Sequence, residues 1–452
     1  MAESDPVNMV HSLANAGYRP PGSALPVRKI RLSRWMNVVS VVAVALLILT
    51  LVGPMLSFRP ERFTGDGNPV RQVIYVLLAL TMLVYVKPWA RPKELLALPL
   101  VLTLALAWCW ISITWSADPA ISARRVALIT VSMWTIFMIV RQSNPQDVLQ
   151  ALRVVLVGVL ILNYVTALGI PAVGVHQYDS LEGAGLVGAW RGVLLHKNHV
   201  GSVSAVTVLA FLFDAKRIHP AVRYLVLAAA FFCLYKSMSK TSMGILAMSV
   251  LCGVIYIRYN PAYRLLLVPA VAVLGIVAYF AAFSYRAEIA GLFADPLGFS
   301  GRVHIWTVVL RAVAEHPWFG VGYGGFWNAG PNSPIYHYTR DWVSLIATAH
   351  CGYIDLMVQI GIPGAVFVVF VALIWPMTKL LATQRISRGA GALLLSLLVF
   401  CAGHNLTETT LFYRDEIMQI FLCFTLALVW RNLDRQRNPQ SNPQRASTRA
   451  RP

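Results

Sequence analysis

Long apolar runs recur along this chain and leave little room for any fold other than a bundle of membrane-spanning helices. A bilayer core is about 30 Å thick, and a helix needs about 20 apolar residues to cross it. Backbone N–H and C=O groups in lipid must be bonded within the segment, so each run is expected to be helical. Only 13% of the 452 residues are charged, whereas soluble domains carry about a quarter. We therefore predict an all-α polytopic membrane protein with about 12 transmembrane helices.

The apolar runs can be drawn as twelve separate spans, several of which must extend into their flanking residues to complete a crossing. They cover Val38–Leu56, Val70–Val86, Leu95–Trp115, Val126–Val140, Val148–Leu168, His199–Phe213, Ala221–Tyr235, Ser242–Ile257, Arg264–Phe283, Cys351–Trp375, Gly389–Ala402 and Glu416–Trp430.

The positions of the basic residues predict the orientation of the chain. Lys and Arg gather in both tails and in alternate loops, and an excess of these residues marks the cytoplasmic side. We therefore expect residues 1–37 to form a cytoplasmic basic tail that is largely disordered, 38–430 to form the transmembrane domain, and 431–452 to form a second cytoplasmic, basic and disordered tail. The net charge of +19 is then explained by the topology of the chain. We therefore expect membrane lipids as partners of the basic residues, and no nucleic acid.

A large periplasmic loop, residues 284–350, is expected between the ninth and tenth spans. It contains a predicted helix, Ser300–Glu315, which Ser300 can cap and which His316 and Pro317 end. Arg302 would stand in the first turn of this helix, where a cation opposes the helix dipole. That placement makes sense if an anion lies at the helix start. The apolar stripe of this helix is Val303, Trp306, Leu310 and Val313.

Several predicted outer boundaries each carry a cation or a histidine. One such group alone is equally well explained as an interface anchor, but several can converge on one cavity. Such a cavity would suit a substrate with concentrated negative charge, such as a lipid diphosphate. The sequence offers no acidic pair for a metal on the diphosphate, no zinc set and no Ser-His-Asp triad, so no cofactor is expected. The residues concerned are Arg191, Lys197, Lys240, Arg302 and His350.

Short motifs at these boundaries resemble the O-antigen ligase and Wzy-type polymerase superfamily of bacterial membrane glycosyltransferases, from about Trp110 to Leu422. The ligase signature reads here as His350, Cys351, nine residues, Gly361, two residues and Gly364, and it departs from the pattern at Cys351. The combination of His196–Asn198, Ser239–Ser242 and Gly322–Trp327 is more similar to exopolysaccharide polymerases of the succinoglycan type. The motifs that carry the resemblance to the superfamily as a whole are Trp115–Pro119, Arg191 with His196–Asn198, Ser239–Ser242, Gly301-Arg302 with Trp306, His316–Gly320, Gly322–Phe326, Ala349–Asp355 and Asn405–Glu408.

The resemblance implies a metal-independent, inverting glycosyltransferase at the periplasmic face of the bacterial inner membrane. It would move a glycan from undecaprenyl diphosphate to an acceptor sugar hydroxyl and polymerise exopolysaccharide or O-antigen repeat units, with a chain-length regulator as an accessory partner. The implied catalytic residues are His350, as proton acceptor, with Arg191 and Arg302, as diphosphate ligands. The implied substrate-binding residues are His196, Lys197, Asn198, Lys240, Trp306, Tyr353 and Glu408.

Two other functions stay open at this point. An O-antigen ligase would transfer a finished polysaccharide to lipid A-core, using the same kind of donor. A flippase or transporter of a polysaccharide lipid belongs to a different class. It would place ionisable residues near the membrane midplane and would contain broken helices.

Overall fold

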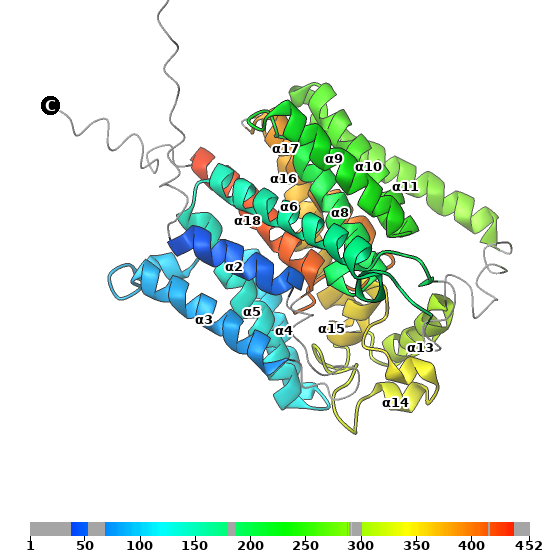
Figure 1. The fold of residues 1–452 in the computed structure, drawn as a ribbon. Coiled ribbons are helices and arrows are strands. Elements are labelled where there is room, and N and C mark those ends of the chain that lie inside the picture. The colour runs from blue at the N-terminus through cyan, green and yellow to red at the C-terminus, as the bar shows by residue number, and fades with distance from the viewer. Residues whose placement is uncertain are drawn as a thin grey trace, which may run out of the picture. The chain divides into compact units, whose positions relative to one another are not determined.

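The computed structural model describes residues 38–52, 68–178, 186–286, 288, 291, 301–384, 386–414 and 416–437. Most of this part of the chain is helical, and it has no strand beyond one isolated bridge between Val175 and Trp190. The helices with their bounds are α2 (Val38–Val52), α3 (Pro69–Val86), α4 (Leu100–Ile111), α5 (Pro119–Gln142), α6 (Pro145–Gly169), α7 (Pro171–Gly174), α8 (Lys197–Leu212), α9 (Pro220–Lys236), α10 (Lys240–Arg258), α11 (Leu267–Ser284), α13 (Arg302–Glu315), α14 (Ile335–Tyr338), α15 (Gly352–Val369), α16 (Trp375–Ala382), α17 (Arg388–His404) and α18 (Ile417–Arg437) (Figure 1).

The predicted spans coincide with helices of the structure. Within the described residues, 7 helical segments are long and apolar enough to cross a membrane, and three shorter apolar helices accompany them. Helices such as α3 and α11 turn large apolar side chains outward, as Leu77 (54% exposed) and Leu274 (67% exposed) do. Apolar surface of this kind is expected where a protein faces lipid. The chain is thus an all-α polytopic membrane protein, and the count of twelve crossings stays a prediction.

The loops form two sets, and the members of each set contact one another. This is expected if successive helices cross the membrane in alternating directions. Loops predicted to lie outside meet one another, as Asn198, Arg302 and Glu408 do. Loops predicted to lie inside also meet, since Arg141 pairs with Glu94 at 3.0 Å and Gln146 donates to Asp214 at 3.1 Å. The helix α18 runs on to Arg437, past the predicted boundary at residue 430. Residues 1–37 and 438–452 lie outside the described residues.

The region 301–350 forms a small folded unit with its own apolar core. The predicted helix is confirmed as α13, but its N-cap is Gly301 in a left-handed conformation with φ 80°, while Ser300 lies outside the described residues. Leu310 of the predicted stripe is 46% exposed, so that part of the prediction is wrong. The core side chains come from α13, from α14, from the segments between α13 and α15, and from α15 itself. They are Ile305, Val308, Val309, Ala312, Val313, Val321, Phe326, Trp327, Ile335, Val343, Ala349 and Val358.

The long helix α15 is broken at Gly361. This residue has φ 76° and ψ 166°, which only glycine adopts without strain. The break frees backbone groups, and the segment after α13 bonds them: Ile362 N–H donates to the carbonyl of Pro317 at 2.8 Å, and Val321 N–H donates to that of Val358 at 2.9 Å. Trp108 of α4 donates to the Ile360 carbonyl at 3.1 Å. The break is therefore the point at which both α4 and the folded unit of residues 301–350, the outer unit, bond to α15.

Candidate active site

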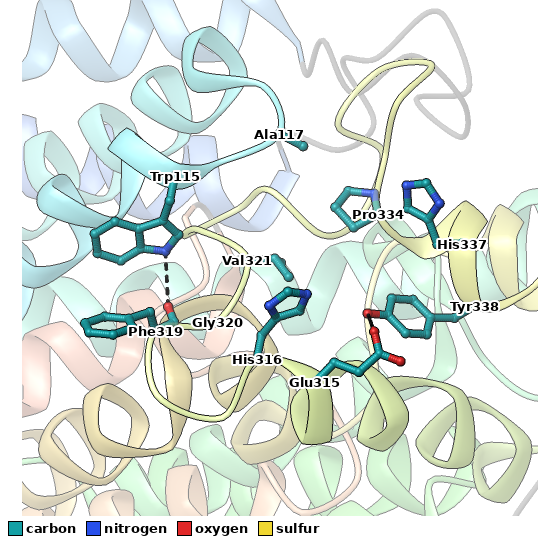
Figure 2. Close-up of a pocket in the computed structure, with 10 residues that line it drawn as sticks. All are labelled: Trp115, Ala117, Glu315, His316, Phe319, Gly320, Val321, Pro334, His337 and Tyr338. Atoms are coloured by element: carbon teal, nitrogen blue, oxygen red, sulfur yellow. Dashed lines mark hydrogen bonds between the residues drawn. The ribbon is translucent and has the colours of Figure 1, made fainter.

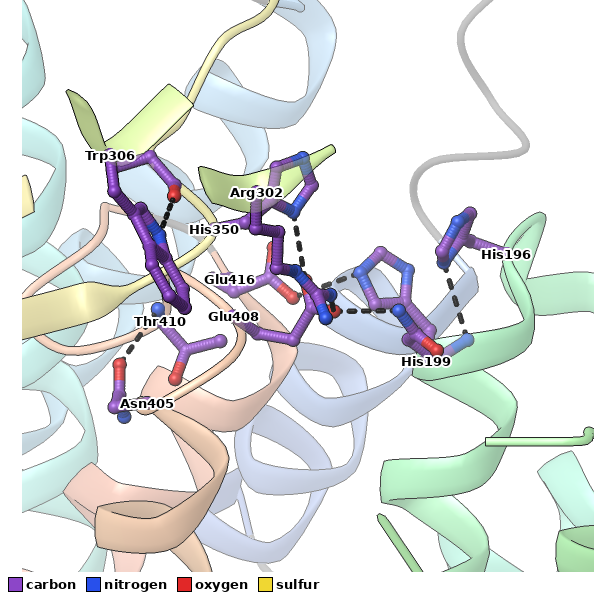
Figure 3. Close-up of polar contacts among 11 residues, drawn as sticks. His196, His199, Arg302, Trp306, His350, Asn405, Glu408, Thr410 and Glu416 are labelled. Atoms are coloured by element: carbon purple, nitrogen blue, oxygen red, sulfur yellow. Dashed lines mark hydrogen bonds and ion pairs between the residues drawn. The ribbon is translucent and has the colours of Figure 1, made fainter. Parts of the chain in front are cut away.

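The carboxylate of Glu408 is the point at which four separate segments meet (Figure 3). Its Oε1 accepts hydrogen bonds from Asn198 Nδ2 at 2.6 Å and from Arg302 Nη2 at 2.7 Å. Its Oε2 lies 3.3 Å from Nδ1 of His350. Glu408 comes from the loop after α17, Asn198 from the first turn of α8 and Arg302 from the first residue of α13, while His350 directly precedes α15. Residues far apart in sequence are thus fixed around one charge.

Backbone contacts hold Glu408 and His350 beside each other. The N–H of Gly352 donates to the carbonyls of Asn405 and Glu408, at 2.9 and 3.1 Å. A Cβ at Gly352 would lie 2.1 Å from Asn405 Oδ1, so only glycine permits this approach. His350 itself has φ 48°, an uncommon conformation for a residue with a side chain. The start of α15 is therefore built around the His350–Glu408 contact, at the cost of local backbone strain.

The orientation of the His350 ring suits a proton acceptor. With Nδ1–H donated to the carboxylate, Nε2 carries the lone pair. A carboxylate in this position fixes the tautomer of a histidine and stabilises its protonated form. The side chain of His350 is 37% exposed while that of Glu408 is 15% exposed, so the histidine faces the open side and the carboxylate lies behind it. Trp306 Nε1 donates to the Ala349 carbonyl at 3.0 Å and steadies the preceding residue.

The surroundings keep Glu408 ionised. Burial acts to raise the pKa of the Glu408 carboxyl, but the hydrogen bond and charge of His350 and the charge of Arg302 outweigh burial and lower the pKa to about 2. His196, the N-cap of α8, is the opposite case, since burial first and then the nearby His199 lower its pKa to about 3. At neutral pH the network thus contains a charged carboxylate and a neutral His196.

A cavity of about 880 Å³ opens in front of this network. Three lysines, Lys197, Lys236 and Lys240, line it together with Arg302 and His350. No carboxylate belongs to the described part of its lining. Such a wall of cations beside a histidine can hold a diphosphate and accept a proton from a hydroxyl in the same space. Other lining residues are Leu186, Gly188, His196, Asn198, Tyr235, Met238, Thr241, Met243, Ile305, Trp342 and Thr407.

Most of the residues selected from the sequence meet at this cavity, and Arg191 does not line it. The Arg191 guanidinium donates to the carbonyls of Val173 and Ala172, at 2.8 and 3.0 Å, and so fastens the loop to α7. Tyr353 donates from its hydroxyl to the Ala402 carbonyl at 2.7 Å and joins α15 to α17. The roles predicted for Arg191, Trp306 and Tyr353 stay predictions, while their contacts in the structure are with the protein backbone.

Sequence reasoning missed Lys236 and Trp342 as cavity residues. It named Glu408 only among the substrate-binding residues, whereas in the structure Glu408 bonds Asn198, Arg302 and His350. Lys236 is the last residue of α9 and Lys240 the first of α10, so the short turn between them presents both cations together. A signal was available for Lys236, because a lysine at the outer end of an apolar run has the same placement as Lys240. The position of Arg302 predicted an anion at the start of α13, and the anion there is the carboxylate of Glu408.

Among the described residues, no group of three or more His, Cys, Asp or Glu side chains is placed to hold a metal ion. The six cysteines are all free, and five of them are buried.

Two comparisons relate the chain to known proteins. Residues 225–369 match the family described as "O-Antigen ligase". This stretch contains Lys236, Lys240, Arg302 and His350, and it ends within the broken helix. The chain is also 27% identical, over 316 residues, to the Exopolysaccharide production protein ExoQ of Rhizobium meliloti (strain 1021). That match covers 63% of this chain and 68% of the relative. The chain is accordingly similar, over these stretches, to the O-antigen ligase family and to an exopolysaccharide production protein.

Proposed function

We propose that this protein is a membrane glycosyltransferase that moves a glycan from undecaprenyl diphosphate to an acceptor sugar hydroxyl at the periplasmic face of the inner membrane. Polymerisation of exopolysaccharide or O-antigen repeat units is the reaction we favour, because the ExoQ relative is described as an exopolysaccharide production protein. The observation that carries the proposal is the His350–Glu408 pair facing a cavity lined by Lys197, Lys236, Lys240 and Arg302.

The proposed step is a single displacement at the anomeric carbon. The acceptor oxygen forms a bond to C1 of the donor sugar while the bond from C1 to the diphosphate oxygen breaks. The hydroxyl proton passes to Nε2 of His350, and Glu408 stabilises the imidazolium that results. Undecaprenyl diphosphate leaves with the bonding electron pair, and the configuration at C1 is inverted.

Cationic side chains take the part that a metal ion plays in other diphosphate reactions. Charge grows on the leaving diphosphate as the C1–O bond breaks, so a fixed cation nearby stabilises the transition state. The three cavity lysines supply mobile ammonium groups, and Arg302 supplies a guanidinium oriented by Glu408. The assignment of Arg191 to the diphosphate finds less support, since its guanidinium already bonds two backbone carbonyls.

An O-antigen ligase is the second candidate, favoured by the description of the family that matches residues 225–369. The donor chemistry would be the same, and the acceptor would be lipid A-core. Transport of a polysaccharide lipid finds less support. The break in α15 is of the kind that transporters use, but the groups flanking Gly361 are bonded by Pro317, Val321 and Trp108 and are not left to hold a substrate.

The test is transfer by purified protein in nanodiscs, given lipid-linked repeat units as donor. We expect wild-type protein to lengthen the glycan and to remain active in EDTA. His350→Ala should lose about 10²- to 10⁴-fold of the rate, which is what general-base catalysis contributes. Membrane insertion and donor binding should persist in this variant. Near-normal transfer by His350→Ala, or activity that depends strictly on added Mg²⁺ or Mn²⁺, would contradict the proposal; transfer to lipid A-core alone would favour the ligase.

A further inference from the structure

A second cavity, of about 720 Å³, lies at the far end of α13 from the His350–Glu408 pair. We propose that it is a glycan-binding subsite, which holds a part of the sugar chain several units away from the bond being made. The identity of the ligand, a glycan, rests on the proposed function. The new element is a site that binds the sugar chain without reacting with it.

The lining of this cavity has the chemistry that a sugar chain requires. One face of a pyranose ring is made of C–H groups and packs on aromatic rings, while its edge carries hydroxyls that need hydrogen-bond partners. Trp115 and Phe319 lie on one side of the cavity and Tyr338 with Glu315 on the other, with His316 between them (Figure 2). Aromatic faces and polar groups thus surround the same space.

The aromatic side of the cavity is held in shape before any ligand arrives. Trp115 Nε1 donates to the Phe319 carbonyl at 3.2 Å, and the two ring centroids lie 5.6 Å apart. Trp108 packs against both rings, at 5.9 and 6.0 Å. Phe319 is nevertheless 58% exposed. A large ring that is fixed on one face and open on the other offers a platform for a ligand.

The polar side is equally ordered. The Tyr338 hydroxyl donates to Oε2 of Glu315 at 2.7 Å, which leaves the other carboxylate oxygen as an acceptor. Burial, followed by the hydrogen bond with Glu315, raises the pKa of Tyr338 to about 12, so the hydroxyl stays neutral in the working range of pH. His316 and His337 add ring nitrogens at the rim.

The helix α13 connects the two cavities at a fixed spacing. Its first residue, Arg302, lines the cationic cavity, and its last, Glu315, lines the aromatic one. At about 1.5 Å per residue, its 14 residues span roughly 20 Å. The buried face of α13 packs into the core of the outer unit, so the spacing is rigid. A ligand that occupies both cavities must therefore be an oligosaccharide chain and not a single sugar.

The experiment measures glycan binding in a His350→Ala background, so that no turnover interferes. The probes are oligosaccharides released from the cell's own polymer by partial hydrolysis, and, in a second arm, the lipid-linked donor. The variants are Phe319→Ala and Glu315→Gln, with Trp318→Ala as the matched control. Trp318 is the neighbouring aromatic residue, is 69% exposed, and does not line the cavity.

We expect Phe319→Ala to weaken binding about tenfold, Glu315→Gln to weaken it less, and Trp318→Ala to leave it unchanged. If Phe319→Ala weakens binding of the released oligosaccharides only, the subsite belongs to the acceptor chain. If it weakens binding of the lipid-linked donor only, the subsite belongs to the donor glycan. In an otherwise wild-type protein, Phe319→Ala should shorten the polymer.

Two results would overturn the subsite. One is wild-type affinity of Phe319→Ala and Glu315→Gln for both probes. The other is no binding of either probe by the parent protein together with unchanged polymer length in Phe319→Ala. The proposed function fails by a different result, namely full transfer by His350→Ala, which leaves the binding measurement valid.

Discussion

Glu408 and Arg302 stand 106 residues apart in the chain and form an ion pair of 2.7 Å, with side chains only 15% and 18% exposed. The same carboxylate bonds His350 through its other oxygen. A change at Glu408 should therefore reach both the proposed base and the start of α13.

Glu408→Gln should abolish most transfer while the protein still folds. Glutamine keeps the shape of the side chain and can still accept a hydrogen bond, but it cannot stabilise a protonated His350. We expect a loss of about 10²-fold or more in kcat with a smaller change in the KM for donor. Single-turnover transfer, normalised to folded protein, measures this. A loss seen only in KM would assign Glu408 to substrate binding instead.

Acid should weaken the fold through Glu408. Its folded pKa of about 2 lies below the ordinary value of 4.5. The carboxylate therefore contributes stability above pH 4.5, and this contribution is lost as the pH falls from about 4.5 towards 2. Thermal unfolding of detergent-purified protein at pH 7 and pH 3.5 should show a smaller drop for Glu408→Gln than for wild type. Equal drops in the two proteins would mean that another group controls acid stability.

Arg302→Lys and Arg191→Lys should fail in different ways. At residue 302 an ammonium cannot reproduce the guanidinium held by Glu408, so activity should fall well beyond any loss of stability. At residue 191 the guanidinium bonds two backbone carbonyls of α7, so we expect lower thermal stability and a loss of activity in proportion. Transfer rates compared with melting temperatures distinguish the two. The opposite pattern would restore Arg191 as a diphosphate ligand.

Lys236→Gln and Lys240→Gln should each weaken donor binding. Both ammonium groups line the cationic cavity from the turn between α9 and α10. We expect a several-fold higher KM for the lipid-linked donor and a weaker dependence of KM on salt, because a charge contact is removed. Lys216→Gln is the control, since Lys216 lies in a loop predicted to face the cytoplasm. A similar effect in the control would show that the charge acts on the membrane surface generally.

Gly361→Ala should destabilise the protein. An added Cβ would lie 2.1 Å from the Trp318 carbonyl oxygen, and the backbone there has φ 76°. We expect a cost of about 1–3 kcal/mol, with the outer unit loosened from α15. Gly158→Ala in α6 is the matched control, since nothing lies within 4 Å of its Cβ position. Proteolysis of the 301–350 region and thermal unfolding report the difference. Equal stability of the two variants would show that the break tolerates a side chain.

The sequence predicted the helices well because apolar runs of this length have one solution in lipid. It also predicted that separate boundaries converge, and Lys197, Lys240, Arg302 and His350 do line one cavity. The pairing of Arg302 with Glu408 was not predictable, because a carboxylate and a guanidinium carry no sign of their partner. Likewise the glycine at 361 gave no indication of the segment that bonds the break, since backbone pairing leaves no pattern in side chains.

The break at Gly361, whose backbone groups are bonded by the 301–350 unit, has a consequence for the order in which this protein assembles in the membrane. In an unbroken helix the N–H of Ile362 would donate to the carbonyl of Val358, four residues earlier, so these two groups can bond each other while α15 enters the bilayer. Their partners in the folded protein, Pro317 and Val321, bond these two groups only once the 301–350 unit packs against α15. We therefore expect α15 to insert as a continuous helix and to break at Gly361 in a later step, when the folded 301–350 unit packs against it.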